Sequence, residues 1–225
     1  FFMWGFTTVL NDILVPHLKG LFSLGAAMAM LVQLAFFGAY FVVGVPAGWL
    51  VARTGYRGGI VAGLLVAAAG ALCFALSSWL HSYAAFLVAL FVLASGITVL
   101  QVAANPYVTL LGPPRTAASR LSLTQGINSL GTTLAPLVGA WLILDGSGAS
   151  GVRVPYLGIT LVLVALAVVF SRVQLPAPPR SLRTDAGGSL WRHRRLRRGV
   201  LAIFLYVGAE VGIGSMLVLF FGSPE

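Results

Sequence analysis

The stretch IVAGLLVAAAGALCFALSSWL, residues 60–80, forms an apolar run without a single charged side chain. A helix rises 1.5 Å per residue, so about 20 apolar residues cross the roughly 30 Å of hydrocarbon in a bilayer. Gly63 and Gly70 in this run would let a neighbouring helix backbone approach closely. The predicted span covers residues 58–80. Comparable runs lie on both sides of it, over residues 1–18, 27–52, 83–111, 119–144, 154–172 and 199–221.

The composition of the whole chain agrees with a membrane environment. Only 8% of the 225 residues are charged, whereas a soluble domain carries about 25%. The apolar runs show no alternation of polar and apolar residues, which a transmembrane β-barrel would require. The sequence therefore predicts an all-α membrane protein.

The sequence lacks the residue patterns that several function classes require. The single cysteine, Cys73, leaves no partner for an internal disulfide and no cysteine-based metal cluster. The sequence has no HExxH, GxSxG or Walker pattern. We therefore expect no enzymatic activity, no resident cofactor and no metal site formed by such a cluster.

The basic residues predict the orientation in the membrane. If the N-terminus is cytoplasmic, the outside connections hold only Lys19 and Arg153. The inside connections then hold Arg53, Arg57, Arg115, Arg120, Arg172, Arg180, Arg183, Arg192, Arg194, Arg195, Arg197 and Arg198. This asymmetry follows the positive-inside rule. The run WRHRRLRR, residues 191–198, is thus interpreted as a topological signal and a contact for anionic lipid, not a nucleic-acid site.

Two acids lie within apolar runs, Asp12 in the first and Glu210 in the last. A carboxylate at a helix centre costs about 2.5–3.5 kcal/mol on insertion scales, so it is normally directed at a cavity or a partner. We expect both acids to be functional. The alternatives are a protonated acid bonded to a neighbouring helix, or a position closer to the interface.

Amides recur in two other spans. Gln101 and Asn105 are four residues apart, and Gln125 and Asn128 three apart, so each pair lies on one helix face. Amides donate and accept hydrogen bonds, which suits the hydroxyls of a sugar. The alternative is a contact that holds two helices together, worth about 0.6 kcal/mol on average. Two pairs together with two acids favour a polar cavity.

The connection GWLVARTGYRGG, residues 48–59, resembles the loop signature of the major facilitator superfamily. Four residues match that signature: Gly48, Arg53, Gly55 and Arg57. Ala52 stands where the family usually has an acid. The resemblance implies a tight cytoplasmic loop with a role in gating.

Four further stretches are together similar to the fucose–galactose–glucose symporter family. They are FFMWGFTTVLNDILVPHLK from residue 1, QVAANPYVTLLGP from 101, SRLSLTQGINSLGTTLAP from 119 and FLYVGAEVGIGS from 204. Members of this family have two six-helix halves. The resemblance implies a truncated chain, with an N-terminal six-span half over 1–172, a basic cytoplasmic linker over 173–198 and the seventh span over 199–225.

The resemblance also implies roles for the polar residues. Asp12 matches an acid of the fucose branch that resembles a proton-coupling, sugar-contacting group, and Gln125 and Asn128 match sugar contacts of that branch. Gln101 stands where the fucose branch has a glutamate, which favours the glucose/galactose branch. Glu210 is an acid where the fucose branch has a glutamine.

The function implied is hexose symport by alternating access, with a proton or a sodium ion near Asp12 and Glu210. We expect a monomer that transports glucose or galactose across the inner membrane of a bacterium. A fucose or other sugar:proton symporter of the same family, or a multi-span protein that transports nothing, remains the alternative.

Overall fold

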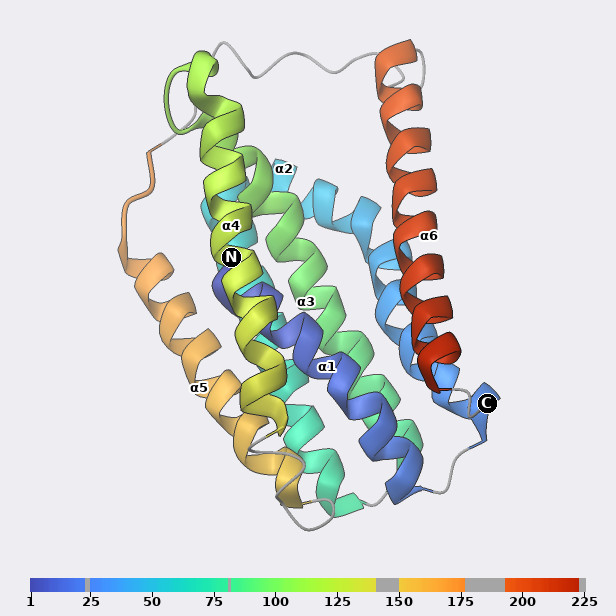
Figure 1. Cartoon of the computed structure of the whole chain (residues 1–225). Coiled ribbons are helices and arrows are strands. Elements are labelled where there is room, and N and C mark those ends of the chain that lie inside the picture. The colour runs from blue at the N-terminus through green and yellow to red at the C-terminus, as the bar shows by residue number, and fades with distance from the viewer. Residues whose placement is uncertain (23–24, 81, 141–149, 177–192, 223–225) are drawn as a thin grey trace. The chain divides into compact units, whose positions relative to one another are not determined.

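The computed structural model describes residues 1–22, 25–80, 82–140, 150–176 and 193–222 (Figure 1). Its α-helices are α1 (Phe2–Leu21), α2 (Ala26–Leu80), α3 (Tyr83–Leu110), α4 (Ala117–Gly139), α5 (Ser150–Arg172) and α6 (Arg194–Gly222). A short 3-10 helix, η1 (Pro114–Thr116), precedes α4. The described residues contain no strand, and the predicted all-α fold is confirmed.

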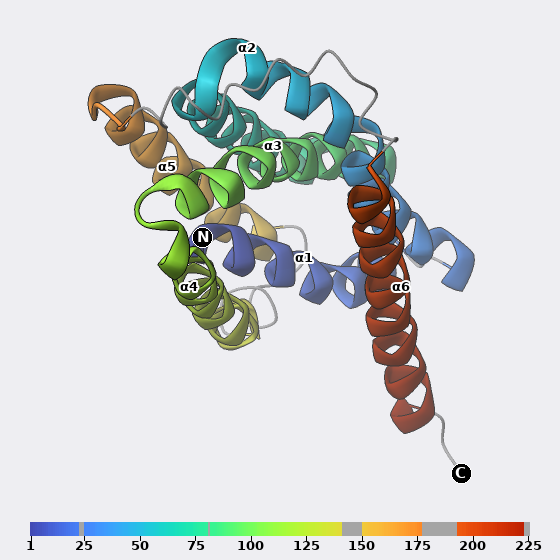
Figure 2. The same cartoon turned by 90° about the horizontal axis from the view of Figure 1, so that it is seen from above.

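The chain divides into two compact units, Phe1–Pro178 and Pro179–Glu225. The first unit holds α1 to α5. In it α2 packs against α3 and α5, and α1 packs against α4, as Figure 2 shows from above. The second unit holds α6, whose first turns carry the exposed residues Arg194, Arg195, Arg197 and Arg198.

Two predicted spans meet within α2. The helix is broken at Gly55, which adopts φ 76° and ψ 172°. This combination of positive φ and extended ψ is essentially restricted to glycine, which has no Cβ. The expected interruption between 52 and 58 is therefore a single-residue break, and helix continues on both sides.

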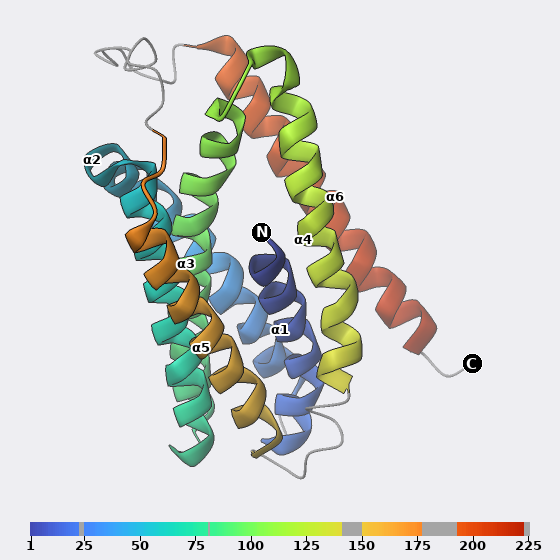
Figure 3. The same cartoon turned by 90° about the vertical axis from the view of Figure 1, so that its left-hand side faces the viewer.

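Three helices of the described chain are long and apolar enough to cross a membrane: Leu31–Leu80, Tyr83–Leu110 and Arg153–Arg172. The polar helix α4 is not among them. Helix α4 packs along α1 and joins α3 through a short connection, which Figure 3 shows from the side. The predicted span over 119–144 ends as helix at Gly139, and its remaining residues from 141 lie outside the described chain.

The contact between α2 and α3 depends on small residues. A Cβ added to Gly63 would lie 2.7 Å from the Leu100 amide nitrogen, and one added to Gly70 or Gly96 would also overlap backbone of the facing helix. Such close approach increases dispersion contacts between helices, which is the main source of packing energy in lipid. The sequence-based prediction for Gly63 and Gly70 is confirmed.

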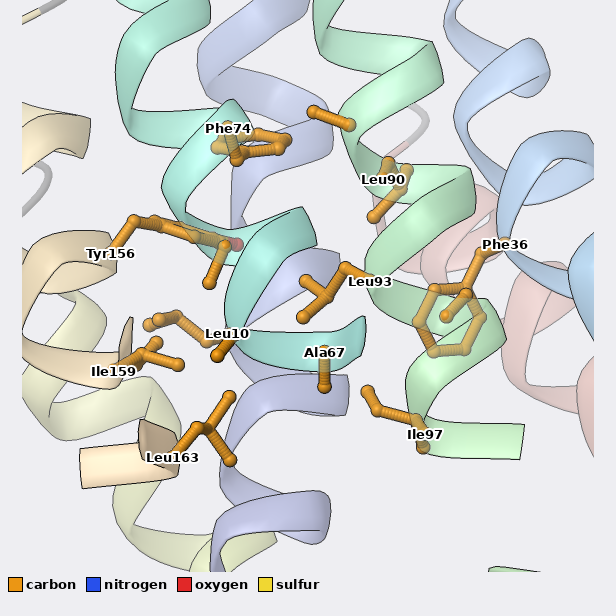
Figure 4. Packing of buried hydrophobic residues seen from close by; sticks show 14 of the residues in the cluster. Leu10, Phe36, Ala67, Phe74, Leu90, Leu93, Ile97, Tyr156, Ile159 and Leu163 are labelled. Atoms are coloured by element: carbon orange, nitrogen blue, oxygen red, sulfur yellow. The ribbon is translucent and has the colours of Figure 1, made fainter. Parts of the chain in front are cut away.

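The core of the first unit has buried residues from each of its helices α1 to α5, and Figure 4 shows part of it. The rings of Phe74 on α2 and Tyr156 on α5 are stacked with centroids 4.3 Å apart. Leu10 of α1 and Leu93 of α3 are fully buried in the same cluster. These residues fix α1 against the other helices and so position the polar side chains of α1.

Side-chain contacts join three segments at one end of this unit. Arg57, two residues after the break at Gly55, donates from Nε to the Phe170 carbonyl near the end of α5 at 3.1 Å. The Tyr107 hydroxyl of α3 donates to the Pro176 carbonyl, also at 3.1 Å. The α2 break and the ends of α3 and α5 thus lie together.

At the opposite end of this unit, Arg153 connects α5 to α2. Its Nε donates to Ser78 Oγ at 3.3 Å, and its guanidinium carbon lies 4.9 Å from the centroid of the Trp79 ring. Basic residues expected on the inside therefore share one end of the first unit, and Arg153 lies at the other. The residues at the shared end are Arg53, Arg57, Arg115, Arg120 and Arg172.

Candidate functional site

Gln101 is bonded to a tyrosine that the sequence analysis did not single out. The Gln101 Nε2 of α3 donates to the Tyr40 hydroxyl of α2 at 2.8 Å, and both residues are half-buried. The same hydroxyl interacts with the side chains of Trp4 and Thr8 on α1. One oxygen atom thus connects three helices. A lone hydroxyl within an apolar span was the only sequence signal for Tyr40.

One contact between side chains joins the two amide pairs of α3 and α4. Gln125 Nε2 donates to Asn105 Oδ1 at 3.4 Å. This separation exceeds the usual 2.7–3.2 Å for such a bond, so the contact is weak. Since Gln101 and Asn105 are one helical turn apart, the amides of α3 and α4 form one polar cluster beside α1.

Asn128 is committed in part to a helix contact. Its Nδ2 donates to the Phe1 carbonyl at 3.1 Å. The approach of α4 to α1 requires glycine on both helices, because a Cβ at Gly5 would lie 2.8 Å from Asn128 Nδ2 and one at Gly131 would lie 2.8 Å from the Phe6 nitrogen. For Asn128, the alternative of a helix-to-helix contact therefore has direct support.

Two buried polar residues of α1 were missed by the sequence analysis. Thr7 and Asn11 are each 1% exposed. The Thr7 hydroxyl and both polar atoms of the Asn11 amide have no hydrogen-bond partner within the described part of the chain. Their position in the run TTVLND, directly before Asp12, is the only signal that the sequence offers.

The side chains of the two predicted acids lie outside the described residues. Asp12 belongs to α1, four residues beyond Thr8, and Glu210 belongs to α6 in the second unit. The expected cation site near these acids falls on the same side chains. Elsewhere in the described chain, no group of three His, Cys, Asp or Glu is placed to hold a metal ion.

Two residues of the predicted gating loop have a clear structural role. Arg57 makes hydrogen bonds to another helix, and Gly55 adopts a backbone conformation that favours glycine. Arg57 donates to the carbonyls of Phe170 and Ser171 at the C-terminal end of α5. Carbonyls at this end of a helix lack intrahelical partners and carry partial negative charge, so a guanidinium stabilises them. Gly55 adopts the positive φ of the break.

The other two residues of the expected loop are Arg53 and Gly48. Arg53 is exposed, and a Cβ added to Gly48 would meet nothing within 4 Å in the described chain. Packing therefore does not explain a glycine at this position.

Arg120 has a structural role that its position in the sequence did not reveal. Its guanidinium donates to the carbonyls of Val108 at 3.1 Å, Thr109 at 2.7 Å and Pro113 at 3.1 Å. These carbonyls lie at the end of α3 and in the connection to α4. Arg120 thus holds the two amide-bearing helices together at the end where the other arginines lie.

A bundle of apolar helices with amides between them defines a multi-span membrane protein. The chain belongs to the major facilitator superfamily, which it matches over residues 1–224. The resemblance expected from the loop signature is thereby confirmed.

Two named transporters match nearly all of this chain. The chain is 53% identical over 234 residues to a glucose/galactose transporter of Brucella abortus, a match covering 100% of this chain and 57% of the relative. It is 35% identical over 248 residues to the L-fucose-proton symporter of Escherichia coli, covering 97% of this chain and 57% of the relative. The chain thus spans about 57% of the length of these relatives.

A solved structure confirms the fold. The crystal structure of the major facilitator superfamily transporter FucP in the outward conformation superimposes with a TM-score of 0.85 at 34% identity. The match covers 98% of this chain and 61% of FucP. The first unit therefore has the helix arrangement of this superfamily.

Proposed function

We propose that the chain is part of a hexose:cation symporter that moves glucose or galactose by alternating access. The observation that carries the proposal is the 53% identity along the whole chain to a protein named glucose/galactose transporter. The amide cluster between α3 and α4 supports it, because its donors and acceptors match sugar hydroxyls. Transport, rather than catalysis, is the activity that these residues fit.

The proposed sugar contacts are Asp12, Gln101, Asn105, Gln125 and Asn128. The long bond between Gln125 and Asn105 can be exchanged for bonds to a ligand at small cost. Asn128 retains one amide N–H and its carbonyl oxygen for a ligand after its bond to the Phe1 carbonyl. A site of this kind rejects analogues that lack a bonded hydroxyl, since its buried polar groups would then lose their partners.

The proposed coupling residues are Asp12 and Glu210. Burial in the membrane favours the neutral form of a carboxyl, so uptake of a cation makes these acids tolerable during the conformational change. The relative named L-fucose-proton symporter favours a proton over sodium. It also supports a second candidate function, which is proton symport of fucose or another sugar.

We further propose a cytoplasmic N-terminus, with the end bearing Arg57 and Arg120 facing the cytoplasm of a bacterium and the chain in its inner membrane. In this orientation residues 1–172 form the N-terminal half, residues 173–198 a cytoplasmic linker, and residues 199–225 the start of the second half. Residues Gly48, Arg53, Gly55 and Arg57 would form the cytoplasmic gating loop, in which Arg57 fixes the α2 break to α5.

Reconstitution of the full-length protein in liposomes tests this function. We expect labelled glucose or galactose to accumulate when a proton or sodium gradient is imposed, and unlabelled fucose to compete weakly. Stronger competition by fucose than by galactose would support the second candidate. The absence of any sugar uptake under either gradient would contradict both.

A further inference from the structure

The hydroxyl of Tyr40 lies where side chains of α1, α2 and α3 meet. Gln101 Nε2 donates to it at 2.8 Å, and the side chains of Trp4 and Thr8 interact with it from α1. The Thr8 hydroxyl in turn donates to the Trp4 carbonyl at 2.9 Å.

The hydrogen-bonding capacity of the Tyr40 hydroxyl fits the bond from Gln101. A tyrosine oxygen accepts two hydrogen bonds and donates one. The amide N–H of Gln101 donates to this oxygen, which leaves the oxygen one acceptor position and its own proton for other partners. The Thr8 hydroxyl donates its single proton to the Trp4 carbonyl.

This arrangement determines which end of the Gln101 amide faces a ligand. With its nitrogen held by Tyr40, Gln101 presents its carbonyl oxygen, which accepts a hydrogen bond from a sugar hydroxyl. Asn105 lies one turn further along α3 and continues the same face. We propose that Tyr40 is a positioning residue of the sugar site, which acts by orienting the Gln101 amide; the inference rests on the proposed hexose transport.

The ring of Tyr40 packs against other aromatic rings of α2. The role of the ring can therefore be tested separately from that of the hydroxyl. The ring centroid lies 5.4 Å from that of Phe36 and 6.5 Å from that of Phe37. Phenylalanine at position 40 keeps these contacts and removes only the oxygen. Tyr40→Phe therefore tests the network without opening a cavity.

The test is a double-mutant cycle on the full-length protein, with the equilibrium affinity for labelled galactose and glucose as the readout. We expect Tyr40→Phe and Gln101→Ala each to weaken the affinity about three- to tenfold. In the Gln101→Ala background, Tyr40→Phe should cause no further loss, because Tyr40 has no amide left to orient. Independent losses that multiply, or an unchanged affinity in either single variant, would overturn the inference.

A second route tests the same network from α1. Thr8→Val removes the hydroxyl that interacts with Tyr40 while keeping the shape of the side chain. We expect a weaker affinity that again disappears in the Gln101→Ala background. If Tyr40→Phe gives no folded protein, this variant decides the question, and an effect independent of Gln101 overturns the inference.

Tyr83→Phe is the matched control. The Tyr83 hydroxyl also bonds from α3 to α2, donating to the Met28 carbonyl at 2.5 Å, but it lies at the other end of α3 from Gln101. We expect an unchanged affinity. An equal loss in Tyr83→Phe would show that general loosening of α2 against α3 explains the effect, which overturns the role of Tyr40. Failure of the wild-type protein to bind any hexose would instead contradict the proposed function.

Discussion

Asn128 and Gln125 lie one turn apart on α4, yet their amides are bonded differently. Asn128 donates to the backbone of α1 at 3.1 Å, whereas Gln125 donates to the side chain of Asn105 at 3.4 Å. A bond to a backbone carbonyl fixes one helix against another. A long bond between two side chains leaves both amides ready to rearrange around a ligand.

This difference predicts distinct outcomes for the two alanine variants. Gln125→Ala should weaken hexose affinity by up to about tenfold, the effect of losing one hydrogen bond of about 0.5–1.5 kcal/mol. It should leave the unfolding temperature nearly unchanged. Asn128→Ala should reduce both affinity and unfolding temperature, because it also removes the bond to Phe1. Ligand binding and thermal unfolding of the purified full-length protein measure both, and normal binding by both variants would identify the amides as helix contacts.

The sequence predicted the faces on which these side chains lie but not their partners. Spacings of three and four residues placed each amide pair on one face, and the structure brings the two pairs together through Gln125 and Asn105. The partner of Gln101 depends on how α2 is rotated against α3, which no local pattern specifies. Tyr40 could therefore not be assigned beforehand, and neither could the burial of Asn11.

At the scale of elements, the α2–α3 contact depends on glycines that admit the backbone of the facing helix. Gly96→Val would drive a side chain into Ala67, whose backbone lies too close for any Cβ. Overpacking of this kind typically costs about 1–3 kcal/mol. We expect a clearly lower unfolding temperature. Gly38→Val is the control, since a Cβ there meets nothing within 4 Å in the described chain, and equal destabilisation by both variants would contradict this view of the contact.

The bond from Arg57 to the end of α5 gives a second prediction at this scale. Arg57→Ala leaves the carbonyls of Phe170 and Ser171 without their cation, and we expect a loss of stability of up to about 1 kcal/mol. Because Arg57 is exposed, added salt should reduce the difference from wild type. Arg53→Ala, also exposed, serves as the matched control and should have little effect. Thermal unfolding at low and high salt decides, and the reverse order of the two variants would refute the capping role.

The positions of the helices were largely predictable, whereas their pairing was not. Apolar runs and the connection around Gly55 predicted where helices begin and end, because hydrocarbon thickness and backbone conformation act locally. The pairing of α1 with α4, two elements far apart in the sequence, depends on the complementary glycines Gly5 and Gly131. Local hydrophobicity carries no information about such a match.

At the scale of the whole molecule, the orientation of the bundle is testable by labelling. Ala84 and Ala118 are exposed, and each is the second residue of its helix, α3 and α4 respectively. In a Cys73→Ala background, Ala84→Cys should react with a membrane-impermeant thiol reagent on intact cells. Ala118→Cys should react only after the cells are opened. The opposite pattern would reverse the proposed topology.

The most direct test of cation-coupled transport is accumulation of labelled galactose against its own gradient, measured beside equilibrium exchange in proteoliposomes of the full-length protein. The wild type should accumulate galactose when a cation gradient is imposed. Asp12→Asn should lose this accumulation but retain exchange, because the site still binds sugar without a titratable or cation-binding carboxylate. Glu210→Gln should show weaker cation dependence. Undiminished accumulation by Asp12→Asn would contradict the assignment of the coupling site to α1.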